Sequence, residues 1–409
     1  MKTQRCRASA AETKRKTGKG ALRTALLLLL VLLASCRDDE YVYYSEDVDT
    51  GVASVESEII GMYVLNEGNM GSNKCTLDFL NLSPDSTTIH YTRDIYSECN
   101  PSEVKELGDV GNDVKVYGSR LWMVVNVSNK VVVTDAYSCV KIGQVDIANC
   151  RYLAFDGGYA YVSSYAGPVT LGGTAQLGRV YKVDTLTLEK VDSVTVGYQP
   201  EELCIIDDKL YVANSGGYRA TGDYDRTVSV VDLQTFEEER QIDVAINLHR
   251  CRTDSYGQLW VTSRGNYSVN AVPSRLFCLT DDGSGMQLVD SVDITVSDLC
   301  IVGDSLYYIG VDQTNTTSNG TITYGIVDVT TRQVVSTALS EADEIAAIKV
   351  PYGIMVNPID RDFYIMDARD YVSSGRLYHF LADGTFEYYV TTGDIPGHAA
   401  FLYKRRAKN

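Results

Sequence analysis

The 409-residue sequence has few of the residues that most enzymes and metal sites use. It contains four dispersed histidines, and it has neither a CxxC pair nor a GxSxG motif. Closely spaced cysteines are typical of zinc and redox sites, and GxSxG presents the serine nucleophile of many hydrolases. We therefore predict no metal, no cofactor and no catalytic residue, and we expect that the protein is not an enzyme.

Basic residues are scarce outside the first 35 positions. Residues 1–35 contain eight Lys or Arg and one acid, which leaves 29 basic and 53 acidic residues in the rest of the chain, a net charge of −24. Such a charge repels nucleic acid and anionic membrane surfaces. The sequence therefore excludes nucleic acid as a partner and predicts contact with a membrane only through an anchor.

The one long apolar run, Ala25–Ser35, is too short to span a bilayer but suits the core of a signal peptide. It ends in LLASC, where Cys36 resembles the lipobox cysteine of bacterial lipoproteins, which implies cleavage before Cys36 and a lipid on its thiol. Arg37 and the three acidic residues after it, 38–40, resemble the acidic tag that directs Bacteroidetes lipoproteins to the outer face of the outer membrane, although they would also suit a solvated linker.

These features divide the chain into three parts. We predict a lipoprotein signal peptide at residues 1–35, and a lipidated cysteine with an acidic flexible tether at residues 36–57. The remaining part, residues 58–405, is the predicted folded domain. The expected location is the outer membrane, lipid-anchored and facing the cell exterior.

A short pattern recurs seven times in the predicted domain. In each copy an apolar residue, an aromatic residue and two or three strand-forming residues lead into a polar turn, as in LYVANSGG (Leu210–Gly217). Successive aromatics are 59, 39, 50, 49, 47 and 57 residues apart, which is the spacing of propeller blades. The seven aromatics are Tyr63, Trp122, Tyr161, Tyr211, Trp260, Tyr307 and Tyr364.

The unit around the fourth copy predicts the blade itself. Four short runs rich in Val, Ile and Tyr, separated by Asp, Asn and Gly turns, are typical of a four-stranded antiparallel meander. Such a sheet alone cannot bury two apolar faces, whereas seven sheets packed around an axis can. We therefore predict an all-β fold, a seven-bladed β-propeller of four-stranded antiparallel blades.

Eight cysteines lie in the predicted propeller. Cys204 and Cys300 occupy the same position of two inner strands and are expected to be small buried residues. Cys75 and Cys99, and also Cys139 and Cys150, are close enough in sequence for disulfides, which the export route permits. The connectivity stays open at this stage.

Loops that follow the repeated aromatic and loops that enter the inner strands share one face of a propeller. In this sequence they carry Tyr and Arg interleaved with Asn and carboxylates, a set that suits a large, polar, partly flat ligand. An ordinary turn or cap role remains the alternative for each single residue. The candidate ligand-binding residues are Asn69, Met70, Asn112, Arg151, Tyr152, Tyr165, Glu201, Tyr218, Arg219, His249, Arg250, Arg264, Tyr267, Asp298, Asp312 and Tyr371.

The unit LYVANS…TVSVVDL…IDV resembles the YncE-like seven-bladed propellers. More narrowly, VLNEGNMGSNKCTLDFLN (Val64–Asn81) and DARDYVSSGRLYHFLADGTFEYYVTTGDIPGHAAF (Asp367–Phe401) are similar to the ends of Bacteroidetes surface lipoproteins, some of them BtuG-type cobalamin-binding proteins. The likeness covers roughly residues 59–403. It implies capture of cobalamin or a related corrinoid and transfer to a TonB-dependent outer-membrane transporter.

Two other functions stay open. The same face of the propeller would suit a module that binds a glycan or a protein. A metal-dependent lactonase or lyase is the other alternative, in which Asn66, Asn126, Asn214 and Glu202 would surround a divalent ion in the channel.

Overall fold

The computed structural model describes residues 58–82, 89–103, 106–169, 171–172, 175–219, 223–266, 272–312 and 321–405. All of them belong to one compact unit, residues 49–409. The predicted signal peptide, Cys36 and the tether lie outside the described residues, as does Tyr267. No helix among the described residues is both long and apolar enough to cross a membrane.

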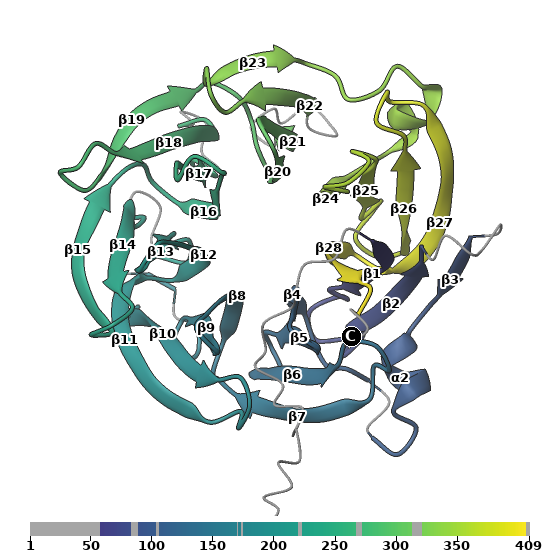
Figure 1. Cartoon of the computed structure of the whole chain (residues 1–409), viewed down its shortest axis with the longest axis horizontal. Coiled ribbons are helices and arrows are strands. Elements are labelled where there is room, and N and C mark those ends of the chain that lie inside the picture. Colours follow the sequence, from purple (N-terminus) through teal and green to yellow (C-terminus); the bar gives the residue numbers. More distant parts are fainter. Residues whose placement is uncertain are drawn as a thin grey trace, which may run out of the picture. The chain divides into compact units, whose positions relative to one another are not determined.

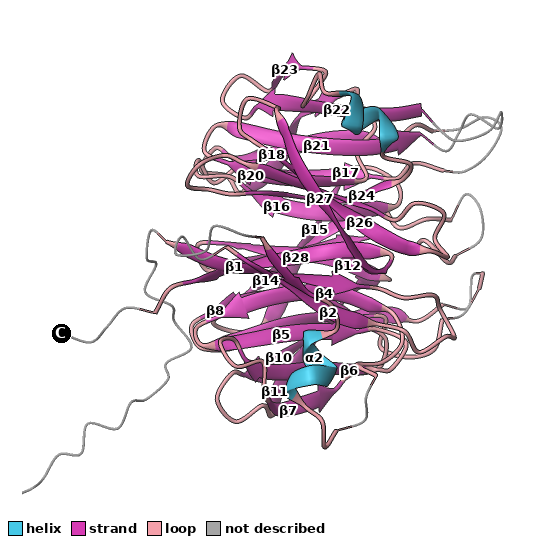
Figure 2. Ribbon diagram, turned by 90° about the vertical axis from the view of Figure 1, so that its right-hand side faces the viewer, coloured by secondary structure: helices cyan, strands magenta, loops and turns pink. Residues whose placement is uncertain are grey.

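The structure confirms the predicted fold class. Seven four-stranded antiparallel sheets stand around a central axis (Figure 1), and the loops gather at the two faces of the ring (Figure 2). Each sheet contributes one strand to the inner wall. These inner strands are β28 (Pro396–Tyr403), β4 (Gly111–Tyr117), β8 (Cys150–Asp156), β12 (Pro200–Ile206), β16 (Leu248–Thr253), β20 (Asp298–Val302) and β24 (Pro351–Val356).

The other strands follow outward in chain order. The second strands are β1 (Ile59–Asn66), β5 (Arg120–Val125), β9 (Tyr159–Ser164), β13 (Lys209–Asn214), β17 (Leu259–Ser263), β21 (Ser305–Asp312) and β25 (Phe363–Asp367). The third strands are β2 (Thr76–Asn81), β6 (Lys130–Asp135), β10 (Leu177–Asp184), β14 (Thr227–Asp232), β18 (Arg275–Asp281), β22 (Thr321–Asp328) and β26 (Ser374–Phe380). The outer strands are β3 (His90–Thr92), β7 (Lys141–Asp146), β11 (Lys190–Tyr198), β15 (Glu237–Asp243), β19 (Met286–Val292), β23 (Gln333–Ser336) and β27 (Phe386–Asp394), and two short helices, α2 (Ile95–Cys99) and the 3-10 helix η1 (Asp343–Ala347), lie between blades.

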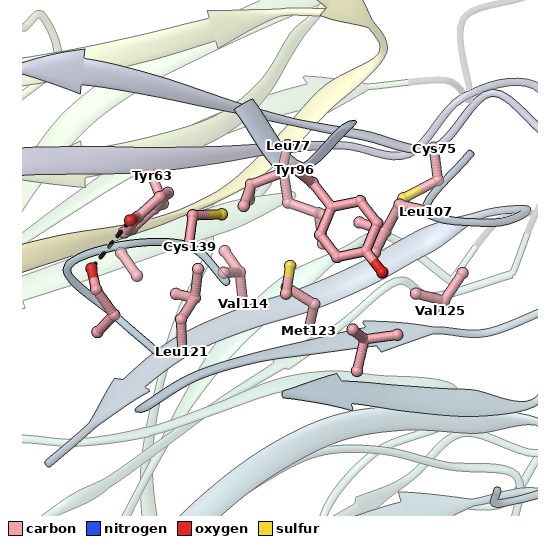
Figure 3. Close-up of a cluster of buried hydrophobic side chains, with 14 of the residues drawn as sticks. Tyr63, Cys75, Leu77, Tyr96, Leu107, Val114, Leu121, Met123, Val125 and Cys139 are labelled. Carbon is pink, nitrogen blue, oxygen red and sulfur yellow. Dashed lines mark hydrogen bonds between the residues drawn. The ribbon is translucent and has the colours of Figure 1, made fainter. Parts of the chain in front are cut away.

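The seven repeated aromatics all lie in second strands. The two neighbouring blades cover this strand, one on each face of the sheet. Buried residues of adjacent blades interdigitate there, as Figure 3 shows for Tyr63, Leu77, Val114 and Met123. The Tyr63 hydroxyl donates a hydrogen bond of 2.9 Å to the Ala136 carbonyl of the next blade. The apolar repeat therefore builds the interfaces between blades.

A recurring aspartate shapes the turn from third to outer strand. Oδ1 of Asp232 accepts hydrogen bonds from the backbone N–H groups of Gln234 and Thr235, at 2.9 and 2.7 Å. Asp184 and Asp328 make the same pair of bonds in their blades. This side-chain mimic of a turn explains why Asp recurs at that point of the sequence.

The ring is closed by the two ends of the described chain. Strand β28 supplies the inner strand of the blade that β1 begins, with Met62 paired to Phe401 and Val64 to Ala399. Figure 1 shows this as the yellow strand beside the purple one. The first blade is therefore completed only by residues more than 300 positions away in the sequence.

The disulfides that sequence proximity suggested are wrong, since all eight described cysteines are free. In a propeller, each strand of a few residues runs from one face of the ring to the other, so cysteines close in sequence can lie at opposite faces. Cys139 lies in the turn between β6 and β7, and Cys150 begins β8 at the opposite face. Cys204 and Cys300 are partly rather than fully buried, because their inner strands line the channel.

Candidate ligand-binding site

One end of the channel holds a cavity of about 360 Å³. Inner strands begin at this face and second strands end there, because neighbouring strands are antiparallel, so residues of both kinds converge on it. The sequence-predicted residues that line the cavity are Met70, Asn112, Arg151, Tyr152, Tyr218, His249, Arg250, Arg264 and Tyr371.

A buried carboxylate fixes two of the arginines. Glu201, whose side chain is 2% exposed, accepts Arg151 Nε and Nη2 at 3.1 and 2.9 Å on Oε2. Its Oε1 accepts Arg264 Nη1 at 3.3 Å and the Tyr165 hydroxyl at 2.7 Å. Burial disfavours the charged carboxylate, but the two guanidinium groups outweigh it and lower the pKa of Glu201 to about 2. Glu201 thus stays charged and holds both arginines against the cavity.

Arg250 is held by a second carboxylate below the cavity. Its Nε lies 3.0 Å from Asp298 Oδ1, and both side chains are almost fully buried. Asp298 Oδ2 also accepts the Ile354 backbone N–H at 3.0 Å, which ties the pair to the next blade. Burial raises the pKa of Asp298, and Arg250 opposes that shift. The pair orients the guanidinium toward the cavity.

Tyr152 joins the polar groups at the centre. Its hydroxyl is 2.9 Å from His249 Nε2 and accepts a hydrogen bond of 3.4 Å from Arg250 Nη1. Its ring also packs edge-on against His398, with centroids 6.1 Å apart. Burial and the surrounding arginines hold the pKa of both histidines well below the ordinary value. Both imidazoles are therefore neutral at pH 7 and offer hydrogen bonds without charge.

Glu67 lines the cavity opposite the arginines. Its Oε2 accepts the Tyr352 hydroxyl at 3.1 Å, and its Oε1 lies 3.9 Å from His398 Nε2. Burial raises the pKa of Glu67 to about 7, with the Tyr352 hydrogen bond and three arginines partly opposing the shift. Glu67 therefore exchanges a proton near neutral pH.

Sequence reasoning missed Glu67, Tyr352 and His398, although a positional signal exists. Glu67 stands four residues after its repeated aromatic, as Arg264 does after Trp260. Tyr352 follows Pro351 at the start of an inner strand, as Glu201 follows Pro200. Aligning the repeats by blade position rather than by residue type would have selected Glu67 and Tyr352.

The remaining predicted residues lie elsewhere. Tyr165, Glu201 and Asp298 support the cavity from below, and Asn69 is not among the described residues that line it. Arg219 stacks over Tyr198, 3.9 Å from the ring centroid, and pairs with Asp223 at 2.6 Å. Arg219 is not among the described residues that line the cavity, and its role at a ligand stays a prediction. The side chain of Asp312 and all of Tyr267 lie outside the described residues.

The four groups proposed to surround a metal are each bound to other protein groups, and Asn126 donates to the Cys150 carbonyl at 2.8 Å. Asn66 donates to Thr76 Oγ1 at 3.0 Å, and Asn214 donates to Ser229 Oγ at 2.9 Å. Both amides pack against glycines of outer strands, where a Cβ at Gly393 would lie 2.7 Å from Asn66. Glu202 pairs with Arg252 at 2.9 Å. Within the described part of the chain, no three His, Cys, Asp or Glu side chains are grouped as metal ligands.

Comparison with known proteins identifies a family and a fold. The sequence model of a family described as a domain of unknown function (DUF5074) matches residues 60–383. No curated protein matches the chain.

Solved structures similar to this chain are distant in sequence. A hypothetical selenium-binding protein from Sulfolobus tokodaii is 12% identical, with a TM-score of 0.60 over 86% of this chain and 97% of that one. The periplasmic gluconolactonase of Pseudomonas aeruginosa is 11% identical, with a TM-score of 0.58 over 84% and 99%. A putative 6-phosphogluconolactonase from Bacteroides fragilis is 10% identical, with a TM-score of 0.58 over 84% and 98%. These likenesses show the fold alone.

Proposed function

The chain belongs to the DUF5074 family, and we propose that it is a binding protein that captures a nutrient ligand in the axial cavity. The observation that carries this proposal is the convergence of arginine, tyrosine and histidine side chains from several blades on one cavity. Strands β8 and β16 hold Arg151, Tyr152, His249 and Arg250 in place before a ligand arrives, which reduces the entropy lost on binding. The first candidate ligand is cobalamin or a related corrinoid.

The size of the cavity bears on how a corrinoid would bind. Sites that enclose drug-sized ligands measure about 300–1,000 Å³, so a cavity of about 360 Å³ is at the small end of that range. A corrinoid is larger than such ligands and would lie across the mouth with one edge inserted. Tyr218 and Tyr371 are 42% and 39% exposed at the mouth and offer flat rings to such a ligand.

Delivery to a TonB-dependent transporter and a lipid-anchored position on the outer membrane are parts of the same proposal. They are supported by the LLASC motif and the acidic residues that follow it. In this scheme the propeller holds the ligand outside the cell until the transporter accepts it. A surface module that binds a glycan or a protein would use the same mouth.

Calorimetric titration of the full chain in detergent with cyanocobalamin tests the corrinoid proposal. We expect saturable one-to-one binding, which Tyr218→Ala and Tyr371→Ala each weaken about tenfold through loss of stacking. Tyr256→Ala is the matched control, since Tyr256 is 58% exposed in the turn between β16 and β17 at the other end of the strands. Absence of binding, or equal effects of all three variants, would reject a corrinoid at this mouth.

Hydrolysis of a sugar lactone is a second candidate, favoured by one observation. Glu67 has a pKa of about 7 inside the cavity, a value suited to a general base. If this function is correct, the chain should open glucono-δ-lactone and Glu67→Gln should abolish the activity. Turnover that survives this substitution would exclude Glu67 as the base.

A further inference from the structure

We propose that the axial cavity recognises an anionic group of its ligand, a carboxylate or a phosphate, and that Glu67 takes up a proton when this group binds. The inference deepens the proposed function, since both place the ligand in the same cavity. It concerns the chemical class of the bound group and applies whether or not the ligand is a corrinoid.

The charges around the cavity are arranged in two layers. Arg151, Arg250 and Arg264 line the cavity, whereas their partners Glu201 and Asp298 lie beneath it with side chains 2% and 6% exposed. The carboxylates therefore hold the guanidinium groups in place without facing a ligand. A guanidinium presents a planar set of donors that fits a carboxylate or a phosphate. The surface that a ligand meets is cationic, although the chain carries a net charge of −17.

The guanidinium groups around the cavity differ in how they share their carboxylate partners. Arg250 pairs with Asp298, and Arg252 pairs with Glu202, so these four charges balance. Arg151 and Arg264 share the single carboxylate of Glu201. Glu67, which lines the cavity, interacts favourably with the charges of both arginines.

Glu67 is the one carboxylate among the described residues that line the cavity. An anionic group that enters between the arginines takes the place of Glu67 as their counter-charge and lies beside it. Two carboxylates in a small, buried space repel one another, so one of them binds a proton. Since a ligand carboxylate would contact the arginines directly, Glu67 is the group that becomes neutral.

The neighbours of Glu67 are compatible with this exchange. From β24 the Tyr352 hydroxyl contacts it, from β28 His398 faces it, and Tyr371 and the Cys75 thiol lie near enough to interact with its charge. The arginines face it from β8, β16 and the loop after β17. The histidines and tyrosines are neutral at pH 7, and burial keeps the thiol protonated, so Glu67 is the group that changes charge.

The experiment compares two flat probes that differ in charge. Naphthalene-2-carboxylate and naphthalene-2-carboxamide are titrated calorimetrically into the full chain in detergent, at low salt and at pH 6 and pH 8. We expect the carboxylate to bind at least tenfold more tightly than the carboxamide at pH 6. Its affinity should fall about tenfold between pH 6 and pH 8, because a group with a pKa of about 7 loses its proton over that range. Titrations in two buffers of different ionisation enthalpy should show uptake of nearly one proton at pH 8.

Two variants with opposite expected effects distinguish recognition from misfolding. Glu67→Gln keeps a hydrogen-bonding side chain and should bind the carboxylate about tenfold more tightly than the native chain at pH 8, with no pH dependence. Arg264→Gln should weaken the carboxylate at least tenfold and leave the carboxamide unchanged. Lys209→Gln, which removes a cation at the other end of β13, should behave as the native chain.

The outcomes separate this inference from the corrinoid proposal. Equal binding of the two probes, or a Glu67→Gln variant with native pH dependence, overturns the anion site even if cyanocobalamin binds. Charge-selective binding of the probes without binding of cyanocobalamin supports the anion site and rejects the corrinoid.

Discussion

At the scale of the residue, Glu67 couples the site to the stability of the fold. Its pKa rises from about 4.3 in the unfolded chain to about 7 in the folded protein, so the folded state binds the proton more tightly. Stability is then greatest below pH 4 as far as this group is concerned, and falls as the pH rises through 7. We expect Glu67→Gln to be more stable than the native chain by about 2–4 kcal/mol at pH 8 and nearly equal to it at pH 4. Urea unfolding at both values measures the difference.

A stabilising effect of Glu67→Gln that is the same at pH 4 and pH 8 would show that burial does not perturb the pKa of this carboxyl.

Glu67 also illustrates a limit of prediction from sequence. Residue type directed attention to arginines and tyrosines in the loops, and many of those do line the cavity. The pKa of the buried Glu67 depends on Tyr352, Arg151 and Arg250, which come from other blades far along the chain, so its protonation could not be predicted.

At the scale of the element, the closing strand β28 is expected to contribute strongly to the stability of the ring. Phe401 is 7% exposed and packs in a cluster with Tyr364 and Met62 of two blades. Phe401→Ala should lower the free energy of unfolding by about 3 kcal/mol, because it leaves a cavity where the two ends of the propeller meet. Val335→Ala in outer strand β23, where the side chain is 61% exposed, should change it by less than about 0.5 kcal/mol. Similar losses of unfolding free energy in both variants would show that packing at the ring closure does not contribute more to stability than an exposed outer strand.

Elements with local signals were predictable, and those set by distant partners were not. The repeated aromatic marks the second strand, and the Asp of the outer turn marks the end of the third, because both effects act within a blade. The strand that completes the first blade comes from the far end of the domain, which no local pattern reveals. The cysteine pairs failed for the related reason that residues close in sequence stand at opposite faces.

At the scale of the whole molecule, a closed ring predicts that no blade unfolds alone, and the two tryptophans can test this. Trp122 is buried between the β4–β7 and β8–β11 blades, and Trp260 between the β16–β19 and β20–β23 blades. Each emission signal therefore reports on a different interface.

The single-tryptophan variants Trp122→Phe and Trp260→Phe, unfolded in urea, should each give a fluorescence transition that coincides with the loss of strand signal in circular dichroism. The two variants differ in stability, since Trp260 Nε1 donates to the buried Asp254 Oδ2 at 2.8 Å, so each is compared with its own dichroism curve. If the fluorescence midpoint precedes the dichroism midpoint in one variant, the interface around the remaining tryptophan opens first. The ring would then not be a single cooperative unit.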